Sequence, residues 1–98
     1  MSTFVRSEVF SSWLRRLRDQ KGKARIIARL EAAYLGSFGD CAFVANGIYE
    51  MRIHFGPGYR VYFTRRREHV YLLVGGDKST QRRDIRTALS IWRNLEKK

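Results

Sequence analysis

Residues 47–63, GIYEMRIHFGPGYRVYF, carry the side chains of this chain that are best suited to chemistry. Alternate positions hold polar or reactive groups: Glu50, Arg52, His54, Arg60, Tyr62 and Thr64. Guanidinium groups bind phosphate through a planar set of donors and stay charged, while a carboxylate or an imidazole can move protons near neutral pH. Taken together, the set points to phosphodiester chemistry. For any single residue, an exposed sheet face with ordinary ion pairs is the alternative.

Two strands around the turn at residues 56–58 would position this set. Successive side chains on a strand point to opposite faces, so the intervening apolar residues, from Tyr49 to Phe63, must share the core side. We expect Phe55 to pair with Tyr59, with a bulge able to shift the pairing by one without changing the two faces. The remaining pairs predicted by this register are Glu50, Arg52 and His54 opposite Thr64, Tyr62 and Arg60.

A second candidate segment is GGDKSTQ, residues 75–81, at a strand-to-helix junction. The Lys-Ser-Thr sequence lacks the glycine spacing of a phosphate-binding P-loop, so that motif is rejected. Free backbone N–H groups at such a junction can still bind an anion. Lys78 is therefore a candidate site residue, and a capped helix start with a solvated lysine is the alternative.

The net charge predicts a polyanionic partner. Twenty Lys and Arg residues against nine Asp and Glu give +11, which favours nucleic acid over an acidic protein or an anionic membrane. Basic runs that could hold a nucleic-acid backbone occur at residues 15–18, 21–29, 65–67 and 82–83. We expect Arg65, Arg82 and Arg83 to contact the nucleic acid.

Other classes of site and location find little support in the sequence. The single Cys41 cannot form an intrachain disulfide, which fits a reducing, cytoplasmic location. No segment approaches the length of a membrane span or resembles a signal peptide. His54, His69 and one cysteine do not make a metal site of recognisable spacing, so neither a metal nor another cofactor is expected.

The pattern of the whole chain predicts one α+β domain, residues 1–98. Helices are expected over 7–19 and 23–35, separated by a break at 19–22 and stopped by Gly36, after a weakly indicated strand at 3–6. Strands are expected at 41–45, 48–55, 59–66 and 69–75, the last ended by two glycines, before a helix capped by Ser79 or Thr80. The predicted architecture is an N-terminal antiparallel helical hairpin on a small, curved, mostly antiparallel sheet of about four to five strands, with a C-terminal helix.

An ordered set of motifs over roughly residues 8–90 resembles a known family. The motifs are FxxWLxxLxD from Phe10, IxxRL from Ile26, GxFGD from Gly36, EMRI from Glu50, GPGYRVY from Gly56 and LxGGDKSTQxxDI from Leu73. This order is similar to the HigB-like branch of the RelE/ParE toxin superfamily, the addiction-module killer proteins. The resemblance implies a RelE-like fold and the toxin half of a type II toxin–antitoxin system.

Many members of that superfamily cut messenger RNA on the ribosome without a metal, by attack of a 2′-hydroxyl on the adjacent phosphate. By this resemblance Arg60 matches the catalytic arginine, and Lys78 falls where the family has a second arginine. Glu50 and Arg52 occupy strand positions that hold paired lysines in RelE, so Glu50 is a departure. A C-terminal tyrosine is also missing, and Tyr62 is expected to stack on a base in its place.

The implied partners are messenger RNA on the ribosome and a cognate helix-turn-helix, HigA-like antitoxin. An acidic segment on the antitoxin would complement the basic surface. The alternative function is a ParE-like toxin that binds and poisons DNA gyrase without catalysis. A plain nucleic-acid-binding domain explains the charge but not the clustering of reactive side chains.

Overall fold

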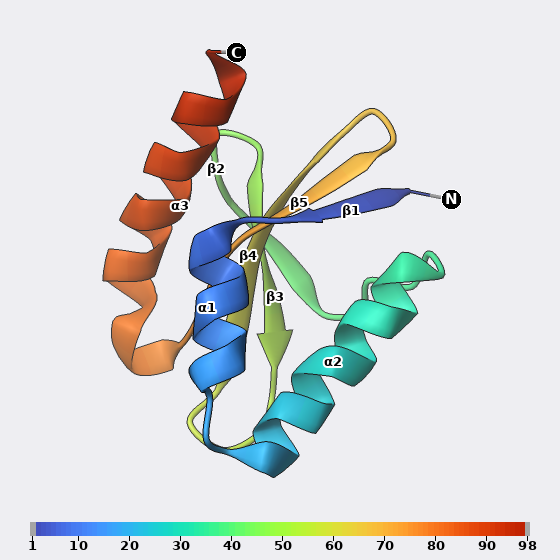
Figure 1. Ribbon diagram of the computed structural model, residues 1–98, viewed down its shortest axis with the longest axis vertical. Coiled ribbons are helices and arrows are strands. Elements are labelled where there is room, and N and C mark those ends of the chain that lie inside the picture. Colours follow the sequence, from blue (N-terminus) through green and yellow to red (C-terminus); the bar gives the residue numbers. More distant parts are fainter. Residues whose placement is uncertain (1, 98) are drawn as a thin grey trace.

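A five-stranded sheet lies between two helical layers in the computed structural model, which describes residues 2–97 (Figure 1). The elements in chain order are β1 (Thr3–Arg6), α1 (Glu8–Arg16), α2 (Gln20–Tyr34), β2 (Cys41–Ala45), β3 (Ile48–Ile53), β4 (Tyr59–Arg66), β5 (His69–Asp77), a 3₁₀ turn η1 (Lys78–Thr80) and α3 (Gln81–Glu96). The strand order is β1-β5-β4-β3-β2, with β1 parallel to β5 and every other pair antiparallel. The predicted α+β class and C-terminal helix are confirmed.

The order of the first elements corrects the prediction of a helical hairpin at the N-terminus. A strand comes first, and the two helices follow it. Thr3 N donates to Glu68 O and Ser7 N to Leu72 O, so this short strand completes the edge of the sheet beside β5. Its parallel pairing sets the direction in which the chain enters α1, which then packs on β5.

The helix ends follow from local capping. Ser7 Oγ accepts a hydrogen bond from Phe10 N and caps α1 as expected, and Gly36, at φ +102°, follows the end of α2. The predicted break between the two helices is present but lies at 17–19 and not at 19–22, since Asp19 accepts from Gly22 N and caps a helix that already begins at Gln20. Gly22 lies inside α2 because the Tyr59 ring occupies the space that a side chain there would need.

The register of the β3–β4 hairpin differs by two residues from the prediction. Ile53, not Phe55, pairs with Tyr59, which places Glu50 opposite Tyr62 and Arg52 opposite Arg60. The connection is longer because Gly58 N bonds to Phe55 O in a turn. A shift of two preserves which side chains share a face, so the predicted sorting remains.

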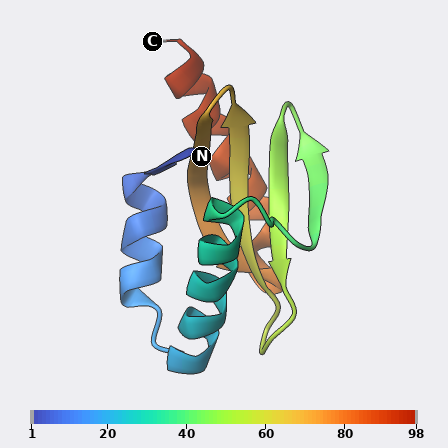
Figure 2. The ribbon, with the colours of Figure 1, turned by 90° about the vertical axis from the view of Figure 1, so that its right-hand side faces the viewer.

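Both faces of the sheet are covered, as Figure 2 shows with α1 and α2 on one side and α3 on the other. The first face packs α1 and α2 over residues that include Met51, Val61 and Phe63. The second face packs α3 over Ile48, Tyr62, Leu73 and Val74. The face predicted to be polar and reactive is therefore half core, because α3 also has an apolar stripe to bury.

Strand β5 continues through Gly75 and Gly76, where the sequence was expected to end it. A Cβ on Gly75 would collide with the Trp13 ring, and one on Gly76 would collide with the Asp84 carboxylate. The glycines thus let α1 and α3 approach the two faces of the strand. No helix within residues 2–97 is long and apolar enough to cross a membrane.

Candidate functional site

Arg60 is held in place by a nearly buried carboxylate. Its Nε donates to Glu50 Oε1 at 2.9 Å, and the two side chains are only 14% and 9% exposed. Gln81, at the start of α3, donates to the same oxygen at 3.0 Å. Arg60 Nη1 also donates to Gly58 O at 3.2 Å. These bonds satisfy the buried charge of Glu50 and fix the plane of the guanidinium, since a buried ion pair persists only when its remaining groups are hydrogen-bonded.

Lys78 starts beside the same glycine that Arg60 contacts. A Cβ built on Gly58 would be 3.5 Å from Arg60 Nη1 and 3.7 Å from Lys78 Cβ, so both side chains border Gly58. Strand pairing explains this proximity, because Tyr59 is opposite Asp77 at the ends of β4 and β5. The exposed Lys78 thus follows directly on the strand that borders Arg60. The structure brings together Glu50, Arg60 and Lys78 as the sequence reasoning expected.

Arg52 and His54 are joined by a residue that the sequence reasoning did not select. Asp40 accepts from Arg52 Nη2 through Oδ1 at 2.7 Å and contacts His54 Nε2 through Oδ2 at 2.6 Å. The bond from Arg52 and then that from His54 lower the pKa of Asp40 to about 2. Asp40 directly precedes β2, and Arg52 N donates to its carbonyl at 2.9 Å. Correct pairing of β2 with β3 would have located it.

Because Asp40 is a carboxylate at neutral pH, it can only accept a hydrogen bond. We therefore assign the proton between the two side chains to His54 Nε2. The imidazole is 75% exposed, and Asp40 contacts it through Nε2 and not through Nδ1. One nitrogen is thus fixed and the other is accessible, which suits proton transfer to a bound ligand.

The strand-to-helix junction is more self-contained than expected. Asp77 Oδ1 accepts from Ser79 N at 2.8 Å and from Ser79 Oγ, while Thr80 Oγ1 bonds to Asp77 and to the buried Asp84. Backbone groups predicted to be free for an anion are therefore partly used by these caps. Lys78 is the member of this junction that faces solvent with a charge.

Tyr62 does not lie where its predicted role requires. It is fully buried beneath α3, and its hydroxyl is an interior atom with no hydrogen-bond partner in residues 2–97. Burial, opposed in part by Arg60, raises the pKa of this phenol far above its usual value. The ring is thus inaccessible to a base, because the apolar side of α3 covers it.

The three predicted RNA-binding arginines are all exposed. Arg65 is on the opposite face of the sheet from Arg60, where its guanidinium carbon is 4.5 Å from the centre of the Phe38 ring. Arg82 and Arg83 are in the first turn of α3, and Arg83 contacts Asp84 at 3.6 Å. Arg65 therefore belongs to a different part of the basic surface from Arg60.

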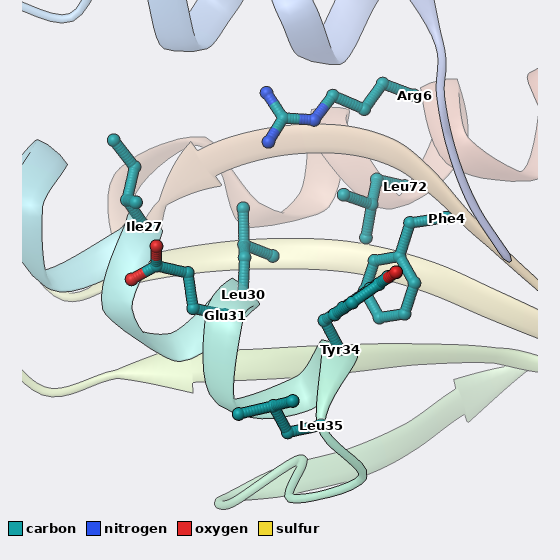
Figure 3. Close-up of a pocket in the computed structure, with 8 residues that line it drawn as sticks. All are labelled: Phe4, Arg6, Ile27, Leu30, Glu31, Tyr34, Leu35 and Leu72. Carbon is teal, nitrogen blue, oxygen red and sulfur yellow. The ribbon is translucent and has the colours of Figure 1, made fainter. Parts of the chain in front are cut away.

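A cavity of about 430 Å³ lies between β1 and α2, on the face away from Glu50 (Figure 3). Its lining is mostly aliphatic and aromatic, with two charged residues: Phe4, Ile27, Leu30, Tyr34, Leu35, Leu72, Arg6 and Glu31. This lining lacks the cations that converge around Arg60. The polar cluster around Arg60 is therefore the better candidate for a chemical site. Among residues 2–97, no three His, Cys, Asp or Glu side chains are grouped to bind a metal ion.

Comparison with known proteins identifies the family of this chain. The model of the family described as "Phage derived protein Gp49-like" matches residues 12–93 of this chain. An uncharacterized protein of Haemophilus influenzae is 49% identical over 87 residues, which cover 88% of each chain. The matched region contains every residue of the site described above.

Proposed function

The chain belongs to the Gp49-like family of phage-derived proteins, a family related to toxin–antitoxin systems, and we propose that it is a toxin that cleaves messenger RNA on the ribosome. The observation that carries this proposal is the anchoring of Arg60 by Glu50, which Gln81 also contacts, with Lys78 beside Gly58. An orienting network of this kind suits a guanidinium that must meet a phosphate in one geometry.

The proposed reaction is an internal phosphoryl transfer. The 2′-oxygen loses its proton and forms a bond to the adjacent phosphorus, the bond from phosphorus to the 5′-oxygen breaks, and that oxygen takes up a proton. Negative charge builds on the non-bridging phosphate oxygens. Arg60 and Lys78 stabilise this charge, and Arg52, opposite Arg60 on β3, adds a third cation.

Glu50 and His54 take different roles in this proposal. Glu50 is committed to the nearly buried pair with Arg60, so it acts as the anchor of that arginine. His54 is exposed, and Asp40 holds its Nε2, which leaves Nδ1 to exchange a proton with the RNA. The Asp40–His54 pair is thus the proton-transfer group of the site.

The antitoxin belongs to the same proposal. A family related to toxin–antitoxin systems implies a cognate antitoxin, and the net charge of +11 favours an acidic segment on it. We propose a small helix-turn-helix protein from a neighbouring reading frame. Its binding would keep the toxin from messenger RNA until it is removed.

The test is a map of message ends in a translating extract. Purified protein should create new 5′ ends in ribosome-bound messenger RNA, and Arg60→Ala should abolish them. Arg93→Ala is the matched control, since it removes the same charge from an exposed position of α3. Circular dichroism and thermal unfolding of Arg60→Ala and Arg60→Lys separate loss of the site from loss of the fold.

The contrary outcome is equally definite. Intact message, together with DNA breaks trapped on gyrase, would overturn the nuclease proposal and support a toxin that acts by binding. Loss of cleavage in Arg93→Ala as well as in Arg60→Ala would show that net charge, not the anchored guanidinium, carries the effect.

A further inference from the structure

Two aromatic side chains are exposed on the edge strand β2 and its neighbour β3, and neither has a role in the catalysis proposed above. Phe43 of β2 and Tyr49 of β3 lie directly opposite each other, and their rings meet edge to face at 5.6 Å. They are 63% and 37% exposed. Strand β2 forms the outer edge of the sheet, as Figure 2 shows. Single exposed apolar side chains are common, but neighbouring exposed rings that contact each other form a patch, and such patches mark interaction sites.

A row of stacked rings fixes these two side chains. Tyr49 stacks on Phe63 with 5.8 Å between the ring centroids and 26° between the ring planes. Phe63 stacks on Phe38 with a centroid distance of 5.4 Å and an interplanar angle of 26°. Phe63, between Tyr49 and Phe38, is buried in the core and holds the row in place. The exposed rings are therefore held ready for a flat ligand, and little side-chain freedom would be lost on binding.

An arginine completes the same surface. Arg65 follows Phe63 by two residues on β4, so both side chains are on the face that carries Tyr49. Its guanidinium lies over the Phe38 ring, and residues 65–67 are all arginines exposed to solvent. Glu68 is the acidic residue in the adjoining turn, so the hairpin end keeps an excess of positive charge.

We propose that Phe43, Tyr49 and Arg65 form a platform for single-stranded nucleic acid, separate from the Arg60 site. Bases would stack on the two rings, and the backbone phosphates would contact Arg65 and its neighbours. Planar rings beside uncompensated guanidiniums match a base joined to a phosphate. An acidic protein would match the charge but would not require flat, exposed rings.

The platform is on the face of the sheet that packs α1 and α2, whereas Arg60 and Glu50 lie on the α3 face. One strand of nucleic acid near the Arg60 site would not reach it directly. The platform therefore serves a second stretch of nucleic acid. This inference does not depend on cleavage and would stand if the proposed nuclease activity failed.

The experiment measures binding of two fluorescent oligomers to the full chain carrying Arg60→Ala, which removes the proposed cleavage. One is a single-stranded oligouridine, and the other is an abasic oligomer with the same number of phosphates. Phe43→Ala with Tyr49→Ala should weaken binding of the oligouridine about 10-fold or more and leave the abasic oligomer unaffected. Arg65→Ala should weaken both and reduce the salt dependence.

The single variant Phe43→Ala is the control for unfolding of the double variant. The Phe43 ring is mostly exposed, and its loss leaves the Tyr49–Phe63 stack in place. Phe43→Trp should retain or increase binding. Equal binding of oligouridine by the parent and the double variant would overturn the proposal. So would a parent that is dimeric in sedimentation and a double variant that is monomeric with unchanged RNA affinity, since the patch would then join two copies of the chain.

Discussion

Arg52 and Arg60 lie directly opposite each other on β3 and β4, and each guanidinium is bonded to a different carboxylate. Arg60 is paired with Glu50 in a nearly buried position, and Arg52 is paired with the more exposed Asp40. Like charges at facing positions of a sheet repel each other. The two carboxylates offset this repulsion and hold both cations in place.

Glu50→Gln tests whether Glu50 anchors Arg60 or acts as a base. We expect message cleavage to fall about 100-fold, because a guanidinium held by a neutral amide is less well oriented. The pH profile of the remaining activity should keep its shape. Loss of its acidic limb would instead identify Glu50 as the base, and rate against pH in the translating extract distinguishes the two.

Arg52→Ala should release the carboxyl group of Asp40. Its pKa should rise from about 2 towards the ordinary value, because the bond from Arg52 is the main cause of the lowering. Because folding lowers the pKa of Asp40, its interaction with Arg52 stabilises the folded protein at pH values above the ordinary carboxyl pKa. This stabilisation is lost as the pH falls towards 2. Carboxyl-carbon NMR of the two proteins measures the shift, and an unchanged pKa would contradict the assignment.

Tyr59→Phe should lower the free energy of unfolding by about 1–3 kcal/mol at neutral pH, since a hydroxyl bonded to a carboxylate is lost. Tyr59 Oη donates to Asp19 Oδ2 at 2.6 Å, and so ties β4 to the cap of α2. Burial, and then this bond, raise the pKa of Tyr59 to about 12. Between its ordinary value and pH 12 the unfolded phenol ionises first, so the stability of the parent should fall with rising pH.

Urea unfolding from pH 7 to 12 checks both parts of that prediction. The variant should lose less stability above pH 10 than the parent does. Equal stability at neutral pH would show that the Asp19 bond contributes nothing net. An identical decline at high pH would assign the effect to the other buried phenol.

Tyr62→Phe is the matched counterpart, and we expect the opposite sign. Its hydroxyl is buried without a partner, so its removal should leave stability unchanged or raise it by about 1 kcal/mol. Cleavage and RNA binding should not change, because the ring lies beneath α3. A loss of RNA binding in a stably folded variant would show that the hydroxyl contacts RNA, which would contradict the burial of Tyr62.

Gly76→Ala should destabilise the fold by about 2 kcal/mol or more, as overpacking does. A methyl group there would collide with the carboxylate of Asp84, a residue of α3 that packs closely against β5. Gly36→Ala provides a comparison, since that position is open and its cost comes from a positive φ alone. Thermal unfolding should rank Gly76→Ala as the more damaging substitution.

The fold was largely predictable because alternation and turn residues act locally. The sequence placed β2, the Asn46-Gly47 turn and the two faces of the hairpin correctly. It failed at Gly75 and Gly76, which ended a strand in the prediction. These glycines serve contacts with Trp13 and Asp84, and such contacts are visible only once the helices are docked.

The candidate site was harder to predict for the same reason. Arg60 could be placed because it lies at the start of β4, and Lys78 because it directly follows β5. Asp40 and Gln81 come from segments distant in sequence, and their roles depend on the actual strand register and on how α3 packs. Tyr62 shares a face with Arg60, but alternation alone does not reveal which half of that face a helix covers.

The pairing of β1 with β5 has a consequence during synthesis of the chain. Ser7 Oγ bonds to the carbonyl of Leu73, which lies 66 positions later, and the first strand has no neighbour in the sheet other than β5. Contacts this distant in sequence close late and slow folding. The residues around Lys78 are translated after β5, so a growing chain has neither a closed sheet nor a complete cation cluster. A cell that makes this protein thus meets the assembled cluster only after residues 78–81 have been translated.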